Sequence, residues 1–337
     1  MSANFISEFE ATECKSSYRL VESLASQYRL LQITLDECHE YIADIGKKEH
    51  FRPANTLLSH LIQQPGVRII LMSGTIPPAT VPAMTRFFGV EPDALDEVRM
   101  SCVRTDIRYV VHTDAEQSDA PTAACLAFQR LRPYIDTHFD FDLGWKAIFY
   151  CSSVDTLQSL SAKLESVHPG RVAQYWANFD NREEDLAAWR SGHKPLLVST
   201  SALFVGIHEP DIRLVMAVGN LYGLSSLLQA WARGGRDGRG GIACLINPRI
   251  SRTVSQSLST DINGVAAVSA LASNTVCRRL PLVEYADGQT AASARKCTQI
   301  PGLTQMCDLC DPHIRRILSG TDSALEAGGD YTFSRLR

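Results

Sequence analysis

Short apolar runs alternate along most of the chain with longer segments in which apolar residues recur at helical spacing. The apolar runs predict buried strands at residues 29–35, 67–72, 146–151, 171–176, 194–200, 212–218 and 241–247. The periodic segments predict helices at residues 55–64, 79–89, 123–138, 154–167 and 181–192, with another starting near 226. Strands that alternate with helices are typical of parallel sheets, so we expect doubly wound α/β domains.

This alternation also suggests how the chain is divided. One α/β series ends near residue 105 and a second occupies about 106–250, with a surface loop expected at 114–121. Past residue 250 the strand signals fade, and helical, cysteine-bearing sequence fills 251–315. A tail that contains glycine and serine follows at 316–337, and we expect it to be disordered.

The composition sets limits on this picture. The 337 residues are 45% hydrophobic and 21% charged, with a mean hydropathy of -0.07, which is the profile of a globular rather than a disordered or fibrous protein. A formal net charge of -4 means that any contact with nucleic acid must be local. The first residues lack a basic stretch followed by an apolar run, so no secretory signal is expected. No segment approaches the ~20 apolar residues of a membrane span, so no membrane partner is expected.

The ten cysteines separate into two groups. Six are scattered and are interpreted as small buried hydrophobes: Cys14, Cys38, Cys102, Cys125, Cys151 and Cys244. The other four are Cys277, Cys297, Cys307 and Cys310, and the last two form a C-x-x-C knuckle. A knuckle places two thiolates on one ion, and two further cysteines complete a closed, tetrahedral Zn²⁺ site. The alternative is four unrelated cysteines, but a knuckle with two upstream partners favours zinc.

An acidic pair, Asp36 and Glu37, follows the predicted strand 29–35 in the sequence D-E-C-H, which ends at His39. Two adjacent carboxylates at such a place suit Mg²⁺ held through water, together with a base that positions an attacking water on a phosphate. Taken alone the pattern is weak, because an acidic pair at a strand end is usually only solvated.

Arginines concentrate between residues 227 and 252. This stretch holds five of them against one acid, Asp237: Arg233, Arg236, Arg239, Arg249 and Arg252. Glycines crowd the first two, so the backbone there can approach a phosphate closely. A phosphate-binding loop and a solvated, glycine-rich arginine loop are the two interpretations of this stretch alone.

These patterns occur as an ordered set. After D-E-C-H come HFRP at 50–53, LMSGTIPP at 71–78, AIFYCSS at 147–153, LLVSTSALFVGIHEPDIRLVM at 196–216 and LLQAWARGGRDGRGG at 227–241. The set resembles the RecQ family of ATP-dependent DNA helicases, within helicase superfamily 2, over about residues 29–311. The cysteine segment, which begins CRRLPLVEYADG at 277, is similar to the zinc-binding module of that family, with the wide spacing of its Bloom-type members. The resemblance implies RecA-like motor lobes at 1–105 and 106–250, the first of them incomplete, and a zinc-binding module at 251–315.

The resemblance also implies roles for single residues. Catalytic roles are implied for Asp36, Glu37 and His39 of motif II and for Arg233 and Arg236 of motif VI, where an arginine reaches the γ-phosphate. Nucleotide contacts and coupling are implied for Ser73, Thr75, Gly206 and Gln229. DNA contacts are implied for Phe51, Arg52, Ser152, Ser153 and Thr200. Arg278 and Arg279 are expected on a DNA-facing surface of the zinc module, pairing with the DNA backbone or within the protein. The implied zinc ligands are Cys277, Cys297, Cys307 and Cys310.

The implied activity is that of a 3′–5′ DNA helicase, which couples hydrolysis of Mg²⁺-ATP to unwinding at junctions of single-stranded and duplex DNA. Its implied cofactors are ATP, Mg²⁺ and Zn²⁺, and its expected setting is DNA repair and recombination in the nucleus. Two alternatives remain open. One is a non-catalytic DNA-binding or interaction remnant of a helicase, and the other is an RNA helicase of the same superfamily, which would not need the cysteine module.

The sequence departs from the family pattern in several places. No G-x-x-x-x-G-K-[ST] phosphate-binding loop occurs, and 35 residues precede Asp36. We therefore expect that the chain begins within a motor lobe and does not hydrolyse ATP by itself. Phe204 and His208 stand where motif V has a glycine and an aspartate, and Ala232 stands where motif VI has a glycine. These changes leave the arginines and acids in place but affect the residues that couple hydrolysis to movement.

Overall fold

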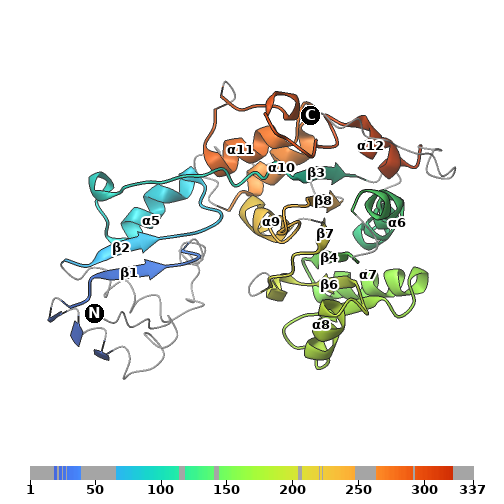
Figure 1. The fold of residues 1–337 in the computed structure, drawn as a ribbon, viewed down its shortest axis with the longest axis horizontal. Helices are drawn as coiled ribbons and strands as arrows, with labels where there is room; N and C mark the ends of the chain where they lie inside the picture. The colour runs from blue at the N-terminus through green and yellow to red at the C-terminus, as the bar shows by residue number, and fades with distance from the viewer. Residues whose placement is uncertain are drawn as a thin grey trace. The chain divides into compact units, whose positions relative to one another are not determined.

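The computed structural model describes residues 19–20, 23–24, 26–27, 29–38, 66–113, 118–139, 144–203, 207–219, 221, 223–246, 263–290 and 293–321. The chain separates into two compact units, residues 1–100 and 101–337, and each is described by itself. Figure 1 shows the course of the chain through them. The predicted helix at 55–64, Cys14 and the sequence beyond 321 lie outside the described residues.

The described part of the first unit contains two parallel strands and a short helix. The strands are β1 (Gln32–Leu35) and β2 (Arg68–Leu71), and the helix is α5 (Val81–Phe88). Helix α5 ends at Gly89, whose φ of 64° is the left-handed conformation that glycine adopts without a Cβ penalty. Both strands and the helix confirm the elements that the sequence pattern predicts here.

The second unit is built on a six-stranded sheet in which all strands are parallel. Its order is β3-β8-β7-β4-β6-β5, with β3 (Ile107–His112), β4 (Lys146–Cys151), β5 (Val172–Tyr175), β6 (Leu196–Ser199), β7 (Ile212–Val218) and β8 (Gly241–Ile246). Every residue of β4, β7 and β8 is buried, because these apolar strands are covered on both faces.

Helices cover both faces of this sheet, as Figure 1 shows. Helices α6 (Ala120–His138), α7 (Val154–Val167) and α12 (Pro312–Ser319) share one core with alternate residues of β4, such as Phe149. Helices α8 (Arg182–Arg190), α9 (Leu224–Trp231), α10 (Val265–Ser273) and α11 (Arg279–Asp287) form the other core with Ile148 and Tyr150. The doubly wound α/β fold expected from the sequence is therefore confirmed.

Strand β3 is an element that the hydrophobic pattern did not predict. Its sequence, IRYVVH, contains an arginine and a histidine and directly follows a polar segment at 101–106, so its apolar run is short. It forms the edge of the sheet beside β8, with Ile107 opposite Gly241. Short 3-10 helices complete the described elements: η1 (Pro78–Thr80), η2 (Pro92–Ala94), η4 (Ser201–Leu203) and η6 (Cys297–Gln299).

The cysteine-bearing segment belongs to the second unit and packs on its sheet. The predicted tail begins too early, since α12 continues to Ser319 and places Ile317 and Leu318 in the core. Their burial explains why residues 316–319 are helical rather than disordered. None of the helices in the described residues is long and apolar enough to cross a membrane.

The scattered cysteines that the structure describes are mostly core residues. Cys38, Cys125, Cys151 and Cys244 are buried, and Cys102 is partly exposed. Burial raises the pKa of the Cys151 thiol to about 12, so this sulfur stays protonated and unreactive near neutral pH. The interpretation of these four buried cysteines as small hydrophobes is confirmed.

Candidate nucleotide and metal sites

The acidic pair lies in the turn that follows β1. Asp36 is exposed and Glu37 is half-buried. The Glu37 amide donates a 2.9 Å hydrogen bond to the Asp36 carboxylate. Glu37 has a φ of 49°, a left-handed conformation that few residues other than glycine adopt. The turn thus presents two carboxylates at the carboxyl end of a strand, where oxygen ligands suit Mg²⁺.

Ser73, which follows the neighbouring strand β2, joins this pair. Its hydroxyl donates to the Glu37 carboxylate at 3.4 Å and accepts a 3.1 Å hydrogen bond from the amide of Thr75, which is buried. Parallel pairing of β1 and β2 places their carboxyl ends together. The structure therefore brings the predicted motif II acid Glu37 into contact with the predicted motif III residue Ser73.

The arginine loop, residues 232–240, connects α9 to β8. Arg233 and Arg236 each donate a hydrogen bond to the Ile207 carbonyl, at 2.9 and 3.1 Å respectively. Arg236 also lies 3.4 Å from Nδ1 of His208. Because Ile207 and His208 belong to the predicted motif V, the structure brings the residues of motifs V and VI together.

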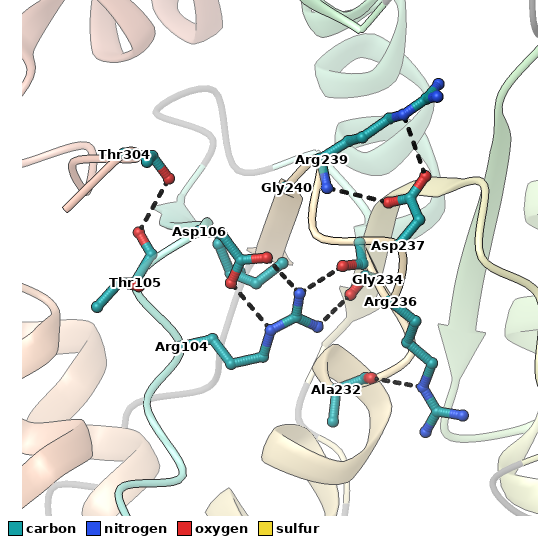
Figure 2. Close-up of polar contacts among 12 residues, drawn as sticks. Arg104, Thr105, Asp106, Ala232, Gly234, Arg236, Asp237, Arg239, Gly240 and Thr304 are labelled. Atoms are coloured by element: carbon teal, nitrogen blue, oxygen red, sulfur yellow. Dashed lines mark hydrogen bonds and ion pairs between the residues drawn. The ribbon is translucent and has the colours of Figure 1, made fainter. Parts of the chain in front are cut away.

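Arg213 of β7 attaches this loop to the sheet. Its buried guanidinium donates to both carboxylate oxygens of Asp237, one of them at 2.9 Å. Asp237 also accepts a 3.1 Å hydrogen bond from the Arg239 amide (Figure 2). Partial burial opposes ionisation of Asp237, but the hydrogen bonds outweigh it and lower the pKa of this carboxyl. The one acid in the arginine-rich stretch is therefore a structural contact of the loop.

Two glycines are required by the path of the loop. Gly240 has a φ of 84°, and a Cβ at this position would lie 2.6 Å from the Asp106 carbonyl oxygen. Gly235 has a φ of 59°, and a Cβ there would lie 2.8 Å from backbone atoms of Gly240. Such distances exclude any side chain without movement of the backbone. The loop is thus packed tightly on itself and on residue 106.

The residues predicted to contact the DNA backbone lie at one edge of the sheet. Ser152 and Ser153 follow β4, and Thr200 follows the adjacent parallel strand β6. Ser152 is exposed, whereas the Ser153 hydroxyl caps α7 by accepting from the Thr156 amide at 3.2 Å. The Thr200 hydroxyl accepts from the Ala202 amide at 3.4 Å. The structure brings the three residues to the same carboxyl edge, and their contact with DNA stays a prediction.

The structure describes only some of the other residues predicted for the nucleotide and DNA sites. Gln229 is half-buried on α9, one turn before Arg233. The remaining predictions lie outside the described residues: His39, Phe51, Arg52 and Gly206.

The four predicted metal ligands form one cluster. The sulfur atoms of Cys277, Cys297, Cys307 and Cys310 all lie within 4.8 Å of one another. Sγ of Cys277 is 3.6 Å from that of Cys297 and 3.8 Å from that of Cys307. Zn–S bonds of about 2.3 Å separate the sulfurs of a tetrahedral site by about 3.8 Å, so this spacing fits zinc. A disulfide needs sulfurs about 2.05 Å apart, and all four cysteines are free.

Backbone amides and thiols support the sulfur atoms. The Arg278 amide donates to Sγ of Cys307, and the Cys307 amide donates to Sγ of Cys297, both at 3.4 Å. Hydrogen bonds among these thiols lower the pKa of Cys277 and raise that of Cys297, so Cys277 is the favoured thiolate of the pair. Since the thiolate is the form that binds metal, the donor set fits a structural site closed by four sulfurs.

The prediction that Arg278 and Arg279 face DNA is wrong. Arg278 is 6% exposed and forms an ion pair with Asp308 of the C-x-x-C knuckle, with 3.0 Å between Nε and Oδ1. Arg279 is fully buried and donates to the carbonyls of Arg104 and Ile107 at 2.6 and 2.8 Å. A buried guanidinium needs such partners to replace water. Both arginines therefore make structural contacts inside the protein, the second of the two roles that the sequence suggested.

Arg104 and Asp106 are contacts of the site that sequence reasoning missed. Arg104 donates to the Asp106 carboxylate and to the carbonyls of Gly234 and Gly235, as Figure 2 shows in part. Arg104 precedes Gly234 by 130 residues, so no local sequence pattern could predict this contact. The one sequence signal is the pair of opposite charges two residues apart, which is common on protein surfaces.

Comparison with known protein families finds a match for the region that contains most of the arginine loop. Residues 129–238 match the helicase conserved C-terminal domain. The matched stretch runs from within α6 to within the arginine loop, and it includes Ser152, Ser153, Thr200, Arg233 and Arg236. Residues 129–238 are therefore similar to a helicase C-terminal domain.

Curated relatives are similar to a longer part of the chain. A putative ATP-dependent DNA helicase Q1 of Caenorhabditis briggsae is 25% identical over 323 residues, which cover 89% of this chain and 48% of the relative. Its Caenorhabditis elegans counterpart is 25% identical over 281 residues, which cover 80% of this chain and 42% of the relative. The chain thus spans about half the length of these relatives. Together with the helicase domain, they confirm the resemblance to the RecQ family of superfamily 2 helicases.

More distant matches share the helicase fold. The ATP-dependent RNA helicase eIF4A of Saccharomyces cerevisiae (strain YJM789) is 23% identical over 220 residues, covering 64% of this chain and 50% of that helicase. The structure of S. cerevisiae Dbp5 bound to RNA and ADP BeF3 matches with a TM-score of 0.50 and 15% identity, covering 89% of this chain and 67% of Dbp5. At this identity the likeness shows the fold alone, that of RecA-like helicase lobes.

Proposed function

We propose that the chain supplies the C-terminal motor lobe and the zinc-binding module of an ATP-dependent DNA helicase of the RecQ type, with 3′–5′ polarity. One combination of features carries this proposal. The same compact unit contains two features. The first is a region similar to the helicase C-terminal domain, in which the arginine loop donates hydrogen bonds to the Ile207 carbonyl. The second is the cluster of four cysteines. The relatives named DNA helicase Q1 support DNA as the substrate.

Arg233 and Arg236 are the residues proposed to act on the nucleotide. Bound Mg²⁺-ATP would supply the phosphoryl group, whose transfer builds negative charge on its oxygens. Both guanidiniums have the Ile207 carbonyl as an acceptor, which keeps their charges close together. A phosphate oxygen is a stronger acceptor than a carbonyl, so either arginine gains by exchanging Ile207 for a γ-phosphate.

Asp36 and Glu37 of the first unit are proposed to act in hydrolysis of Mg²⁺-ATP. Asp36 is exposed and suits Mg²⁺ held through water, while Glu37 suits the orientation of an attacking water. The hydrogen bond from Ser73 fixes the orientation of the Glu37 carboxylate. Ser73 therefore connects this acid to the end of strand β2.

The cysteine cluster favours a DNA helicase of the RecQ type over an RNA helicase. The helicase lobe is common to both classes, as the similarity to eIF4A illustrates. A RecQ-type zinc module is the feature that separates them, and the cluster has the spacing of a Zn²⁺ site. We extend the proposal to junctions of single-stranded and duplex DNA, in repair and recombination in the nucleus.

The test uses the purified 337-residue polypeptide. Its sequence contains no G-x-x-x-x-G-K-[ST] loop, so we expect it to bind DNA without hydrolysing ATP. ATP hydrolysis is measured with and without single-stranded DNA, and binding is measured by fluorescence anisotropy with a 3′-tailed duplex in DNA and RNA versions. We expect background hydrolysis and tighter binding of the DNA version.

Three other results would change this conclusion. DNA-stimulated turnover that Asp36→Ala abolishes would show that the chain is an enzyme on its own. Equal or tighter binding of the RNA version would favour an RNA helicase. Absence of binding to both would remove nucleic acid as the partner of this chain.

A further inference from the structure

Residues 104–109, here called the linking segment, lie between the arginine loop and the cysteine cluster. They comprise the end of the polar stretch before β3 and the first three residues of that strand. Figure 2 shows part of the arrangement, with Arg104 beside the loop and Thr105 beside Thr304. The linking segment therefore makes polar contacts with two functional regions that are distant in sequence.

One set of contacts reaches the arginine loop. The Arg104 guanidinium donates to the carbonyls of Gly234 and Gly235 and is itself oriented by the Asp106 carboxylate. The Asp106 carbonyl accepts a 3.3 Å hydrogen bond from the Gly241 amide, directly after the loop. The backbone of Gly240 passes so close to this carbonyl that no Cβ fits. The loop backbone is therefore positioned by residues 104 and 106.

A second set of contacts reaches the cysteine module. The Thr105 carbonyl accepts from the amides of Thr304 and Gln305, both at 3.3 Å. The Tyr109 carbonyl accepts from the Asp308 amide at 3.2 Å. Asp308 lies between the two knuckle cysteines, so the linking segment is hydrogen-bonded to the metal-binding turn itself.

Arg279 strengthens this second connection. It follows Cys277 by two residues, is fully buried, and donates to the carbonyls of Arg104 and Ile107. Its guanidinium carbon lies 4.9 Å from the centre of the Tyr109 ring, at cation–π distance. Since a buried guanidinium without acceptors is costly, Arg279 and the linking segment must keep their relative positions.

We propose that the linking segment transmits the metal-bound state of the cysteine cluster to the arginine loop, with Arg104 as the positioning residue. Cys277 and the knuckle would be held together by bound Zn²⁺, which would fix Arg279 and the Asp308 amide. These two groups hydrogen-bond to the backbone of the segment that carries Arg104. Arg104 then fixes the carbonyls of Gly234 and Gly235 through its hydrogen bonds to them. The proposal concerns the geometry of the loop, so it stands whether or not the chain hydrolyses ATP.

The experiment measures hydrogen exchange of the full chain by mass spectrometry, with Zn²⁺ bound and after chelation. We expect removal of Zn²⁺ to raise exchange of the amides at 235–240 by about tenfold, the effect of losing one or two charged hydrogen bonds. Arg104→Ala should raise the same exchange with Zn²⁺ still bound. Chelation should then add little in this variant, because both changes act through one connection.

The proposal also requires the reverse effect, since coupling between two sites is reciprocal. Arg104→Ala should weaken the affinity of the chain for Zn²⁺ by about tenfold, and Arg104→Lys should restore part of it. Arg132→Ala is the matched control, because Arg132 forms an ion pair with Asp136 on α6, away from the loop. This control should leave both Zn²⁺ affinity and loop exchange unchanged.

Two results would overturn the proposal. The first is that chelation raises exchange at 277–310 while exchange at 235–240 stays constant. The second is an Arg104→Ala variant with the Zn²⁺ affinity of the parent chain. If chelation unfolds the whole second unit, so that β4 and β7 also exchange, the Zn²⁺ affinity of Arg104→Ala decides the matter alone.

Discussion

Arg213 and Asp237 form an ion pair that joins the central strand β7 to the arginine loop. The side chain of Arg213 is 4% exposed and that of Asp237 is 22% exposed, so the ion pair is largely shielded from water. The pair holds the loop at its midpoint, between Arg236 and Arg239. This ion pair therefore attaches the arginine loop to the sheet.

Arg213→Ala should therefore destabilise the second unit. Removal of one partner of a buried pair typically costs about 3 kcal/mol of unfolding free energy, because the other charge is left without compensation. Urea unfolding followed by circular dichroism measures the loss. The control is Arg239→Ala, whose side chain is 58% exposed and lies 3.8 Å from Asp237. A loss above about 1 kcal/mol in the control would contradict this assignment.

The same pair predicts a dependence of stability on pH. The pKa of Asp237 is lower in the folded protein than the value of about 3.9 for an unfolded chain. Its ionisation thus stabilises the fold above about pH 4, and this stabilisation is lost as the pH falls through the folded pKa. Urea unfolding of wild type and Asp237→Asn should give curves that converge below about pH 4. Parallel curves would mean that Asp237 does not contribute in this way.

Gly240→Ala tests the close approach of the loop to residue 106. Both a φ of 84° and the 2.6 Å separation from the Asp106 carbonyl oppose a methyl group at this position. We expect a loss of about 3 kcal/mol, which adds a backbone shift to the cost of a left-handed alanine. Gly238→Ala is the matched control, since its φ is 78° but nothing lies within 4 Å of its Cβ. It should lose only about 1–2 kcal/mol, and equal losses in the two variants would show that crowding is unimportant.

The cysteine cluster predicts the metal content of the purified chain. We expect about one Zn²⁺ ion per chain by plasma mass spectrometry, because four thiolates complete one tetrahedral site. The double variant with Cys307→Ser and Cys310→Ser should lose the metal and, with it, stability. Cys102→Ser should keep the ion, since Cys102 lies outside the cluster. A parent chain without metal would refute the site.

The hydrophobic pattern predicted the central elements of the second unit well. Strands β4 and β7 and helix α7 have the predicted bounds, because their apolar residues reflect burial on both faces or on one helical face. Strand β3 was missed because Arg108 interrupts its apolar run. In the structure Arg108 is buried and forms a 2.7 Å ion pair with Asp311. Asp311 lies 203 residues further along the chain. Such long-range compensation leaves no local signal.

The candidate site was predictable where its residues form short motifs. Short motifs identified the acidic pair, Arg233, Arg236 and the four cysteines. The structure brings these cysteines together. The DNA-facing role expected for Arg278 and Arg279 came from the resemblance to the zinc-binding module, and the structure instead favours the second role, pairing within the protein. Both are buried here by Asp308 and by backbone carbonyls, which only the tertiary fold supplies.

The order of strands in the sheet has a consequence for synthesis of the chain. Among the strands that the structure describes in the second unit, β3 is the first in the chain and lies at the edge of the sheet, whereas its partner β8 is the last. While the ribosome is still producing the chain before residue 241, β3 has no strand to pair with, although β4, β5, β6 and β7 can already associate. Pairing of segments so distant in sequence is slow because a long loop must close first. We therefore expect attachment of β3, and with it the linking segment, to be a late step in the folding of the newly made chain.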